Sequence, residues 1–308
     1  MLIYDILATV ARRCPKTITR LRYFKHFHRS MNLNSPFEEV NQLATYVSRA
    51  QLHNKNNRRW ALLADKYAVR AEVAKMIGEE YLIPIYGHWE NPAKIDFDSL
   101  PKEYVLKTNN GCGTNVIVKD NSCIDRSAIV RTMKKALEFP YPELTAQLHY
   151  SHIPPCVVAE KLMVQGGGKK SLTDYKVYCV NGKPMVMFIH HDRDEHEHFS
   201  YGMEPYTLKW QQIPKGGSIT TMPDDASVAP EKPECLEKMI ELAATLSKGE
   251  ELLRVDFYII DNKIYFGEFT FTPDTAFNSH FDPYQGVMND ILDQIKEDRK
   301  KGISSQTF

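Results

Sequence analysis

Residues 254–273, RVDFYIIDNKIYFGEFTFTP, constrain the fold more than any other stretch of the sequence. Two runs rich in β-branched and aromatic residues flank Asp261-Asn262, a pattern that is typical of a β-hairpin. Asp256 lies five residues before Asp261, and Glu268 lies six residues after Asn262. Because residues equidistant from a hairpin turn lie opposite each other, the two carboxylates are predicted to lie almost opposite each other.

Carboxylates at that separation repel each other, so one of them becomes protonated unless a cation lies between them. Mg²⁺ suits such a pair, because it prefers oxygen ligands, typically binds one or two carboxylates and fills its other positions with water and phosphate. The alternative is a pair of solvent-facing acids at the end of a sheet, which is an ordinary surface feature. The hairpin alone does not decide between these two interpretations.

The composition excludes several classes of protein. The chain of 308 residues has 39 Lys and Arg against 39 Asp and Glu, so no global charge favours binding to nucleic acid. None of the six cysteines forms a C-x-x-C pair, which argues against a zinc site or a disulfide framework and fits a reducing cytoplasm. The apolar start, MLIYDILATVARR, is too short to span a bilayer and is unlike a secretory leader. The sequence therefore predicts a cytoplasmic globular protein.

Residues 12–29, RRCPKTITRLRYFKHFHR, hold seven Lys or Arg and no acid. Bases with interleaved Leu, Tyr and Phe suit peripheral contact with an anionic membrane face or a lipid-linked glycan. The alternative is a basic surface whose aromatic side packs onto the rest of the domain. A membrane contact would place the protein at the inner face of the membrane.

Periodicity and turn residues divide the remaining chain into short helices and strands. A capping box at Ser35 with Pro36 at the first helical position predicts a helix whose apolar stripe runs from Phe37 to Val47, and Asp65 is predicted to open a second helix that ends at Gly78. Strands are expected at 81–87, 104–108, 115–120, 155–163, 174–180 and 183–189, and further helices at 125–139, 233–248 and 284–301. Asn181-Gly182 predicts a hairpin. This order indicates an α+β fold with antiparallel sheets.

The segment 104–118, YVLKTNNGCGTNVIV, places Lys107 at the end of a strand and then a loop with Gly111 and Gly113. Glycines let backbone N–H groups turn toward an anion and approach it closely, and a lysine alongside suits a phosphate. The pattern differs from a Walker A motif, which needs G-x-x-x-x-G-K-[ST] leading into a helix. A glycine-rich hairpin turn explains this segment equally well.

Two more lysines lie at unusual positions, Lys66 early in a predicted helix and Lys176 inside a predicted strand just after Asp174. Three lysines, a glycine loop and a pair of carboxylates can serve one ligand. A nucleoside triphosphate with Mg²⁺ accounts for all of them.

In their order along the chain these segments resemble the parts of the ATP-grasp superfamily. DKYAVR around Lys66, YVLKTNNGCG, DYKVYCVNGKP and the hairpin look like the TupA-like ATP-grasp proteins of teichuronopeptide and other surface-polysaccharide clusters, over residues 58 to 290. The resemblance implies an ATP-grasp fold, in which two α+β subdomains with antiparallel sheets clasp ATP after a short basic helical segment. The implied division is a helical N-terminal segment, 1–57, a subdomain with the glycine loop, 58–159, and a subdomain with the metal-binding hairpin, 160–308.

The resemblance also implies roles for individual residues in binding ATP. Lys66 and Lys107 resemble the two lysines that contact the phosphates. The loop that folds over the phosphates comprises Gly111, Cys112, Gly113, Thr114 and Asn115. The hinge that reads adenine comprises Glu160, Lys161, Leu162 and Met163. Asp174 resembles the acid that binds the ribose.

The metal site implied by the resemblance comprises Asp256, Glu268 and Thr270 as ligands of Mg²⁺. Lys176 falls where related ligases often carry a basic residue near the γ-phosphate. The sequence departs from the family at Thr270, since many ATP-grasp ligases have E-x-N where this chain has E-F-T. A hydroxyl is a poorer metal ligand than an amide oxygen, so we expect Thr270 to act through water, or one metal to be held less tightly.

ATP-grasp enzymes typically activate a carboxylate as an acylphosphate, from which an amine displaces phosphate to leave an amide. The resemblance therefore implies a ligase that joins an amino acid or amino sugar to a uronic acid in a surface glycan. A carboxylate acceptor also needs cations of its own, and Arg193 and Arg254 are the candidates because an arginine holds a carboxylate bidentately. Each could instead form a surface ion pair.

Two other classes of function stay open. The same ATP site could phosphorylate a sugar hydroxyl, or a glycosyltransferase-like protein could bind a nucleotide sugar without consuming ATP. Segment 190–199, HHDRDEHEHF, has four His and several acids and could form a transition-metal site, a solvated loop or a substrate loop.

Overall fold

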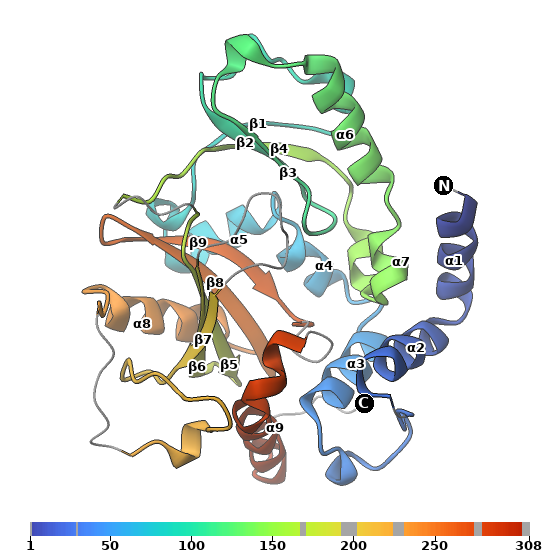
Figure 1. The fold of residues 1–308 in the computed structure, drawn as a ribbon, viewed down its shortest axis with the longest axis vertical. Coiled ribbons are helices and arrows are strands. Elements are labelled where there is room, and N and C mark those ends of the chain that lie inside the picture. Colours follow the sequence, from blue (N-terminus) through green and yellow to red (C-terminus); the bar gives the residue numbers. More distant parts are fainter. Residues whose placement is uncertain are drawn as a thin grey trace.

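The computed structural model describes residues 2–28, 30–166, 171–191, 202–223, 231–273 and 279–303. Two antiparallel sheets dominate it, and helices pack around them (Figure 1). The protein therefore has the α+β fold that the sequence predicts. Within the described ranges, no helix is both long and apolar enough to cross a membrane.

The smaller sheet has the strand order β1-β4-β2-β3. Its strands are β1 Ile85–Trp89, β2 Tyr104–Thr108, β3 Asn115–Val118 and β4 Val157–Lys161. Helix α6, Arg126–Glu138, packs on one face, and Asp125 caps it by accepting a hydrogen bond from the backbone of Ala128 at 2.9 Å. Val105 pairs with Glu160 and Lys107 with Val158, so alternation along the strands turns Lys107 and Glu160 to the other face.

The larger sheet has the strand order β7-β6-β5-β8-β9. Its strands are β5 Asp174–Val180, β6 Lys183–His191, β7 Gly202–Tyr206, β8 Leu252–Ile260 and β9 Lys263–Thr270. Both predicted hairpins are confirmed: Asn181 and Gly182 join β5 to β6, and Asp261 and Asn262 join β8 to β9. All four turn residues have positive φ, which the tight turns of two-residue hairpins require.

Helices cover both faces of the larger sheet. Helix α8, Leu236–Leu246, packs against β5, β6 and β8 on one side. On the other side Phe188 of β6 contacts Phe281 and Tyr284 of the short helix Ser279–Tyr284, which leads into α9, Gln285–Lys300. The part of that second face that α9 leaves uncovered carries the polar residues described below.

The N-terminal quarter of the chain is helical. It comprises α1 Leu2–Arg13, α2 Pro15–Phe27, α3 Leu43–His53, α4 Arg58–Ala64 and α5 Val69–Ile77. In Figure 1, α1 and α2 lie along one edge of the molecule, beside α7, Tyr141–Thr145. Arg12 Nε lies 2.6 Å from Glu143 Oε1, and Arg22 Nη1 donates to the Thr145 carbonyl at 2.5 Å. These contacts fix the first two helices to α7.

The prediction of a helix that opens after Ser35 is wrong for the first half of that segment. A single 3₁₀ turn spans Phe37–Glu39, and α3 begins only at Leu43. The chain stays extended at Val40, which is buried, and at Gln42, whose side chain accepts a hydrogen bond from the Tyr23 hydroxyl. Ser35 does not cap the turn. Tertiary packing therefore overrides the local capping pattern.

The helix predicted to begin at Asp65 is also divided. Asp65 ends α4, and its Oδ1 accepts hydrogen bonds from the backbone of Tyr67 at 2.8 Å and of Ala68 at 3.2 Å. Such a bond from a short acid holds the backbone in a turn rather than a helix. Helix α5 then begins at Val69 and ends at Gly78, as predicted. Lys66 consequently lies on the turn between the two helices.

The division into 1–57, 58–159 and 160–308 stays a prediction. The smaller sheet is built from strands between residues 85 and 161, so β4 extends across the proposed boundary at 160.

Candidate active site

A row of charged side chains crosses three neighbouring strands of the larger sheet. Lys176 of β5 pairs with Asp256 of β8, and Asp256 pairs in turn with Glu268 of β9. Partners in such a register point to the same face of the sheet. Lys176 Nζ lies 2.5 Å from Asp256 Oδ2 and 3.0 Å from Asp174 Oδ2. The sequence therefore predicts the opposition of the two hairpin acids correctly.

A β-bulge accounts for the unequal spacing of these acids about the turn. The register shifts between Asp256 and Phe257, and the extra residue on β9 is Gly267. A Cβ atom at this glycine would lie 3.1 Å from the backbone carbonyl oxygen of Asp256, closer than side chains normally approach. The glycine thus permits the bulge, and the bulge sets Glu268 directly opposite Asp256.

Arg254 supplies the positive charge that two adjacent carboxylates require. Its Nε and Nη2 donate to the two oxygens of Asp256 at 2.6 and 2.7 Å, and Nη2 also donates to Glu268 Oε1 at 3.2 Å. Burial alone would raise the pKa of Asp256, but the charges of Arg254 and Lys176 hold it below its usual range. Asp256 is therefore a buried, ionised carboxylate with a cation on each side.

Glu268 differs from Asp256 in its access to solvent. The side chain of Glu268 is 35% exposed, whereas that of Asp256 is 2% exposed. The hydroxyl of Thr270 donates to Glu268 Oε1 at 3.4 Å, a long hydrogen bond. In the described residues no group of three His, Cys, Asp or Glu is placed to hold a metal ion. A pair of carboxylates nevertheless fits Mg²⁺, whose remaining positions are normally filled by phosphate oxygens and water.

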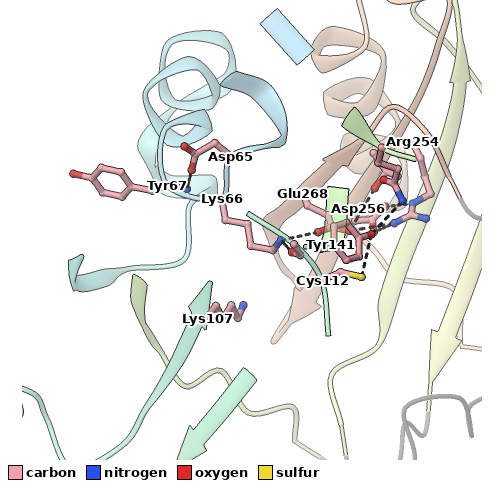
Figure 2. Close-up of polar contacts among 12 residues, drawn as sticks. Asp65, Lys66, Tyr67, Lys107, Cys112, Tyr141, Arg254, Asp256 and Glu268 are labelled. Atoms are coloured by element: carbon pink, nitrogen blue, oxygen red, sulfur yellow. Dashed lines mark hydrogen bonds and ion pairs between the residues drawn. The ribbon is translucent and has the colours of Figure 1, made fainter. Parts of the chain in front are cut away.

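Lys66 joins this cluster to the glycine loop. Its Nζ donates to the carbonyl oxygen of Gly111 at 2.7 Å and lies 3.8 Å from Glu268 Oε2 (Figure 2). The turn that carries Lys66 is held by the segment just after β2, because Asn109 Nδ2 donates a hydrogen bond to Asp65 Oδ1 at 2.9 Å. A cation between a carboxylate and a glycine loop is suited to an anionic group of a ligand.

Three residues that the sequence did not single out support the glycine loop. The thiol of Cys112 donates to the Tyr141 hydroxyl at 3.3 Å, and Gln147 Nε2 donates to the same hydroxyl at 3.2 Å. Gln147 Oε1 in turn accepts a hydrogen bond from Thr272, just after β9, at 3.0 Å. Tyr141 lies far from Cys112 along the chain, and Gln147 lies far from Thr272, so no local sequence pattern predicts these contacts.

A pocket of about 390 Å³ lies between the inner face of the smaller sheet and the larger sheet. The predicted phosphate-binding Lys107, the predicted hinge and Asn115 of the predicted loop all line it, together with Val105, Ile117, Leu172 and Tyr258. Its volume falls in the range of small-molecule sites. The apolar side chains suit a flat aromatic ring, and the charged side chains of Lys107, Lys119, Glu160 and Lys161 line the pocket beside them. In the pocket Lys107 Nζ lies 2.6 Å from Glu160 Oε2.

Tyr258 is the pocket residue that comes from the larger sheet. It lies two residues after Asp256 on β8 and pairs with Asp174 of β5, so all three share one face. Strand alternation was the signal that could have identified it. Through Tyr258 and Asp174 the pocket adjoins the charged row, as base and phosphate subsites of one nucleotide would.

The remaining predicted residues fall in two groups. Cys112 and Gly113, with Thr114 beside them, form the loop between β2 and β3, and Gly113 has a positive φ. Arg193 and most of segment 190–199 lie outside the described residues, so their roles stay predictions. Of that segment His190 is buried, and burial lowers its pKa to about 2, while His191 Nε2 lies 2.8 Å from Glu204 Oε2.

The structure combines two antiparallel sheets, a pocket between them, a glycine loop, nearby lysines and a carboxylate pair, which together fit the ATP-grasp fold. The model of the TupA-like ATP-grasp family matches residues 46–288. The chain belongs to this family. It is an ATP-dependent ligase that uses ATP and Mg²⁺.

Solved structures with a similar fold include D-alanine–D-alanine ligase from Bacillus anthracis complexed with ATP, which is 16% identical, with 79% of this chain and 67% of that chain covered and a TM-score of 0.47. The ATP-grasp ligase PsnB, complexed with minimal precursor, Mg and ADP, is 11% identical, with 83% and 65% covered and a TM-score of 0.43. The D-cycloserine synthetase DcsG is 13% identical, with 88% and 86% covered and a TM-score of 0.44. No curated protein shows significant sequence similarity to the chain.

Proposed function

We propose that the protein is a carboxylate–amine ligase that forms an amide between an amino acid or amino sugar and a uronic acid during the biosynthesis of a surface polysaccharide. The observation that supports this proposal best is the charged row beside the nucleotide pocket. Lys66, Lys176 and Arg254 converge near two carboxylates, which suits the stabilisation of transferring phosphate and of an acceptor carboxylate.

The nucleotide is proposed to lie with its base in the pocket that the hinge and Tyr258 line, and its ribose near Asp174. Lys107 would then leave Glu160 for a phosphate, since a lysine binds phosphate as a mobile point charge. Mg²⁺ would be held by Asp256 and Glu268, with Thr270 directly or through water, and would offset the charge of the phosphates. The loop over residues 111–115 would close over them, and Lys66 already contacts it at Gly111.

The reaction requires two bond exchanges on the acceptor. An oxygen of its carboxylate attacks the γ-phosphorus of ATP, ADP leaves, and an acylphosphate forms. The amine then attacks the acyl carbon, phosphate leaves with the bonding electrons, and the nitrogen loses a proton. Arg254 is proposed to orient the acceptor carboxylate and Lys176 to stabilise charge at the transferring phosphoryl group, because both are held rigidly by Asp256.

A screen of ADP release tests the proposal. The purified protein would be supplied with uronic-acid glycosides, each combined with individual amino acids and amino sugars, and the product mass measured. The expected product has the summed mass of acceptor and amine less one water, and ADP appears only when both are present. ADP release with a phosphorylated sugar and no amine would instead identify a phosphotransferase. Binding of a nucleotide sugar without ADP release would identify a glycosyltransferase-like protein.

Binding of the nucleotide is tested separately by thermal unfolding. A ligand at 100 times its dissociation constant adds about 2.7 kcal/mol to the free energy of unfolding. We expect ATP with Mg²⁺ to raise the melting temperature and excess EDTA to abolish the increase. An equal increase with UTP or with a nucleotide sugar alone would contradict the proposed ATP site.

A further inference from the structure

One face of α2 combines exposed bases with exposed apolar side chains. Lys16, Arg20 and Lys25 are exposed, and Leu21 and Phe24 lie between them with 58% and 56% of their surfaces exposed. At 100° per residue all five fall within one half of the helix circumference. The helix itself is anchored to the protein, so these two large apolar side chains form a surface that no other described part of the protein covers.

The opposite face of α2 is packed, so the exposed face is not an accident of a loose terminus. Thr19 and Tyr23 are buried, and the Tyr23 hydroxyl donates to Gln42 Oε1. The sequence posed two alternatives for residues 12–29, contact with an anionic membrane or a lipid-linked glycan, or a basic surface whose aromatic side packs onto the domain. The aromatic ring of Tyr23 packs inward, as the second alternative requires, whereas Phe24, the next residue, is exposed.

The positive charge of this face is not offset by acidic partners among the described residues. Residues 12–29 contain no acid, although the chain as a whole has equal numbers of acids and bases. Among the described residues, Lys16, Arg20 and Lys25 take part in no ion pair, whereas Arg22 of α2 and Arg12 at the end of α1 are bound to α7. The partner that complements such a face is a surface that is anionic and also accepts apolar groups.

We propose that α2 is a docking helix for an anionic lipid bilayer, lying in the plane of the interface with Leu21 and Phe24 inserted between the lipid headgroups. A bilayer rich in acidic lipids offers negative charge and an apolar layer just beneath it, which is the combination that this face requires. An acidic protein surface would pair with the lysines and the arginine, but it would also need apolar pockets that match Leu21 and Phe24, whereas a bilayer accepts them without such a fit.

The attachment of α2 fixes the orientation of the active site with respect to the bilayer. Arg12 and Arg22 hold α1 and α2 to α7, and Tyr141 of α7 contacts the glycine loop through Cys112. A membrane bound by α2 would therefore lie on the side of the molecule from which α7 supports that loop (Figure 1).

Vesicle co-sedimentation tests the proposal without reference to the ligase activity. The full-length protein would be mixed with vesicles of phosphatidylglycerol and phosphatidylcholine in equal parts, and with vesicles of phosphatidylcholine alone. We expect binding to the first vesicles that weakens steeply with added salt, and little binding to the second. Equal binding to both, or no binding to the anionic vesicles at low salt, would overturn the proposal, the second result leaving an acidic protein as the partner.

Matched variants locate the binding face. Lys16→Ala/Arg20→Ala/Lys25→Ala should weaken binding on the order of a hundredfold, from the usual contribution of a base near an anionic surface. Leu21→Ser/Phe24→Ser should also weaken it, which a purely electrostatic contact would not show. The control is Arg131→Ala/Lys134→Ala/Lys135→Ala, which removes three exposed bases from α6.

The control variant should bind as the wild type does, and an equal loss in the two triple variants would refute the assignment to α2. Retention of the ATP-dependent increase in melting temperature would show that each variant is folded. Substitutions on the outer face of α2 touch no residue of the active site, so their effect on lipid binding is independent of the proposed reaction.

Discussion

The thiol of Cys112, in the glycine loop, donates a hydrogen bond to the hydroxyl of Tyr141 on α7. The ring of the same tyrosine lies against Gly111, where a Cβ atom would be 3.4 Å from the ring. Through Gln147 the hydroxyl is connected to Thr272, which follows β9. The loop proposed to cover the phosphates is therefore supported by the segment that follows the proposed metal-binding strand.

Tyr141→Phe should weaken ATP binding without unfolding the protein. The variant keeps the ring beside Gly111 but removes the acceptor for Cys112 and Gln147, so the loop is held less firmly. A hydrogen bond of this kind contributes about 1 kcal/mol, which corresponds to roughly a fivefold increase in the KM for ATP. The control is Tyr86→Phe at an exposed tyrosine of β1. An unchanged KM in Tyr141→Phe would show that the contact does not position the loop.

Gly267→Ala should destabilise the fold by disturbing the β-bulge. The added methyl group would lie 3.1 Å from the carbonyl oxygen of Asp256, and this neighbour is backbone that cannot rotate away. We expect a loss of about 1–3 kcal/mol in the free energy of unfolding, measured with urea. Gly166→Ala is a matched control, because a Cβ atom there meets no atom within 4 Å. Equal stability of the two variants would contradict the steric role of Gly267.

The stability of the protein should fall as the pH is lowered from 6.5, and His149 should contribute to the loss. Burial, with the nearby His152, lowers the pKa of His149 to about 3, against about 6.5 in an unfolded chain. Below pH 6.5 the unfolded chain therefore binds a proton at His149 that the folded protein does not bind. The free energy of unfolding consequently keeps the full contribution of neutral His149 above pH 6.5 and loses it progressively toward pH 3.

Between pH 6.5 and pH 5 this single group should cost ~2 kcal/mol in the free energy of unfolding. His149→Asn should lose correspondingly less stability over the same interval, whatever its stability at neutral pH. Urea unfolding at the two pH values measures the difference, with His53→Asn as a control at an exposed histidine at the end of α3. The same decline in His149→Asn and in the wild type would refute the assignment.

Local sequence patterns predicted the parts of the site that lie on one hairpin or one loop. Turn residues with positive φ fixed the β8–β9 hairpin, and its register alone brought Asp256 and Glu268 together. The glycine loop between β2 and β3 was likewise visible as a local cluster. In each case the chemistry is carried by residues whose separation along the chain is short.

Contacts between distant segments were not predictable in this way. Lys66 reaches Glu268 and Lys176 reaches Asp256 from segments far away along the chain, and only side-chain geometry reveals these contacts. Tyr141 of α7 contacts the glycine loop, and Gln147, just after α7, contacts Tyr141, but no periodicity marks either residue. Where the local pattern was wrong, at Ser35, burial of Val40 outweighed capping.

The two carboxylates of the hairpin should differ in what their neutralisation costs. Asp256 is buried and compensates both Arg254 and Lys176, so Asp256→Asn removes the shared counter-charge of two buried cations and leaves them only Glu268 and Asp174. Breaking a buried pair in this way costs about 3–5 kcal/mol, and we expect the free energy of unfolding to fall accordingly. Glu268 is partly exposed and lies at 3.2 and 3.8 Å from its cations, so Glu268→Gln should change the stability by less than about 1 kcal/mol.

Both variants should nevertheless lose turnover. A charge that holds Mg²⁺ against the phosphates typically contributes about 3–4 kcal/mol to catalysis, which is two to three orders of magnitude in rate. Glu268→Gln therefore separates the two roles: urea unfolding should match the wild type, whereas ADP release and the Mg²⁺-dependent increase in melting temperature should be lost. Wild-type turnover in Glu268→Gln would show that the pair is only a structural ion network, in which Arg254 and the neighbouring lysines balance the carboxylates without a metal ion.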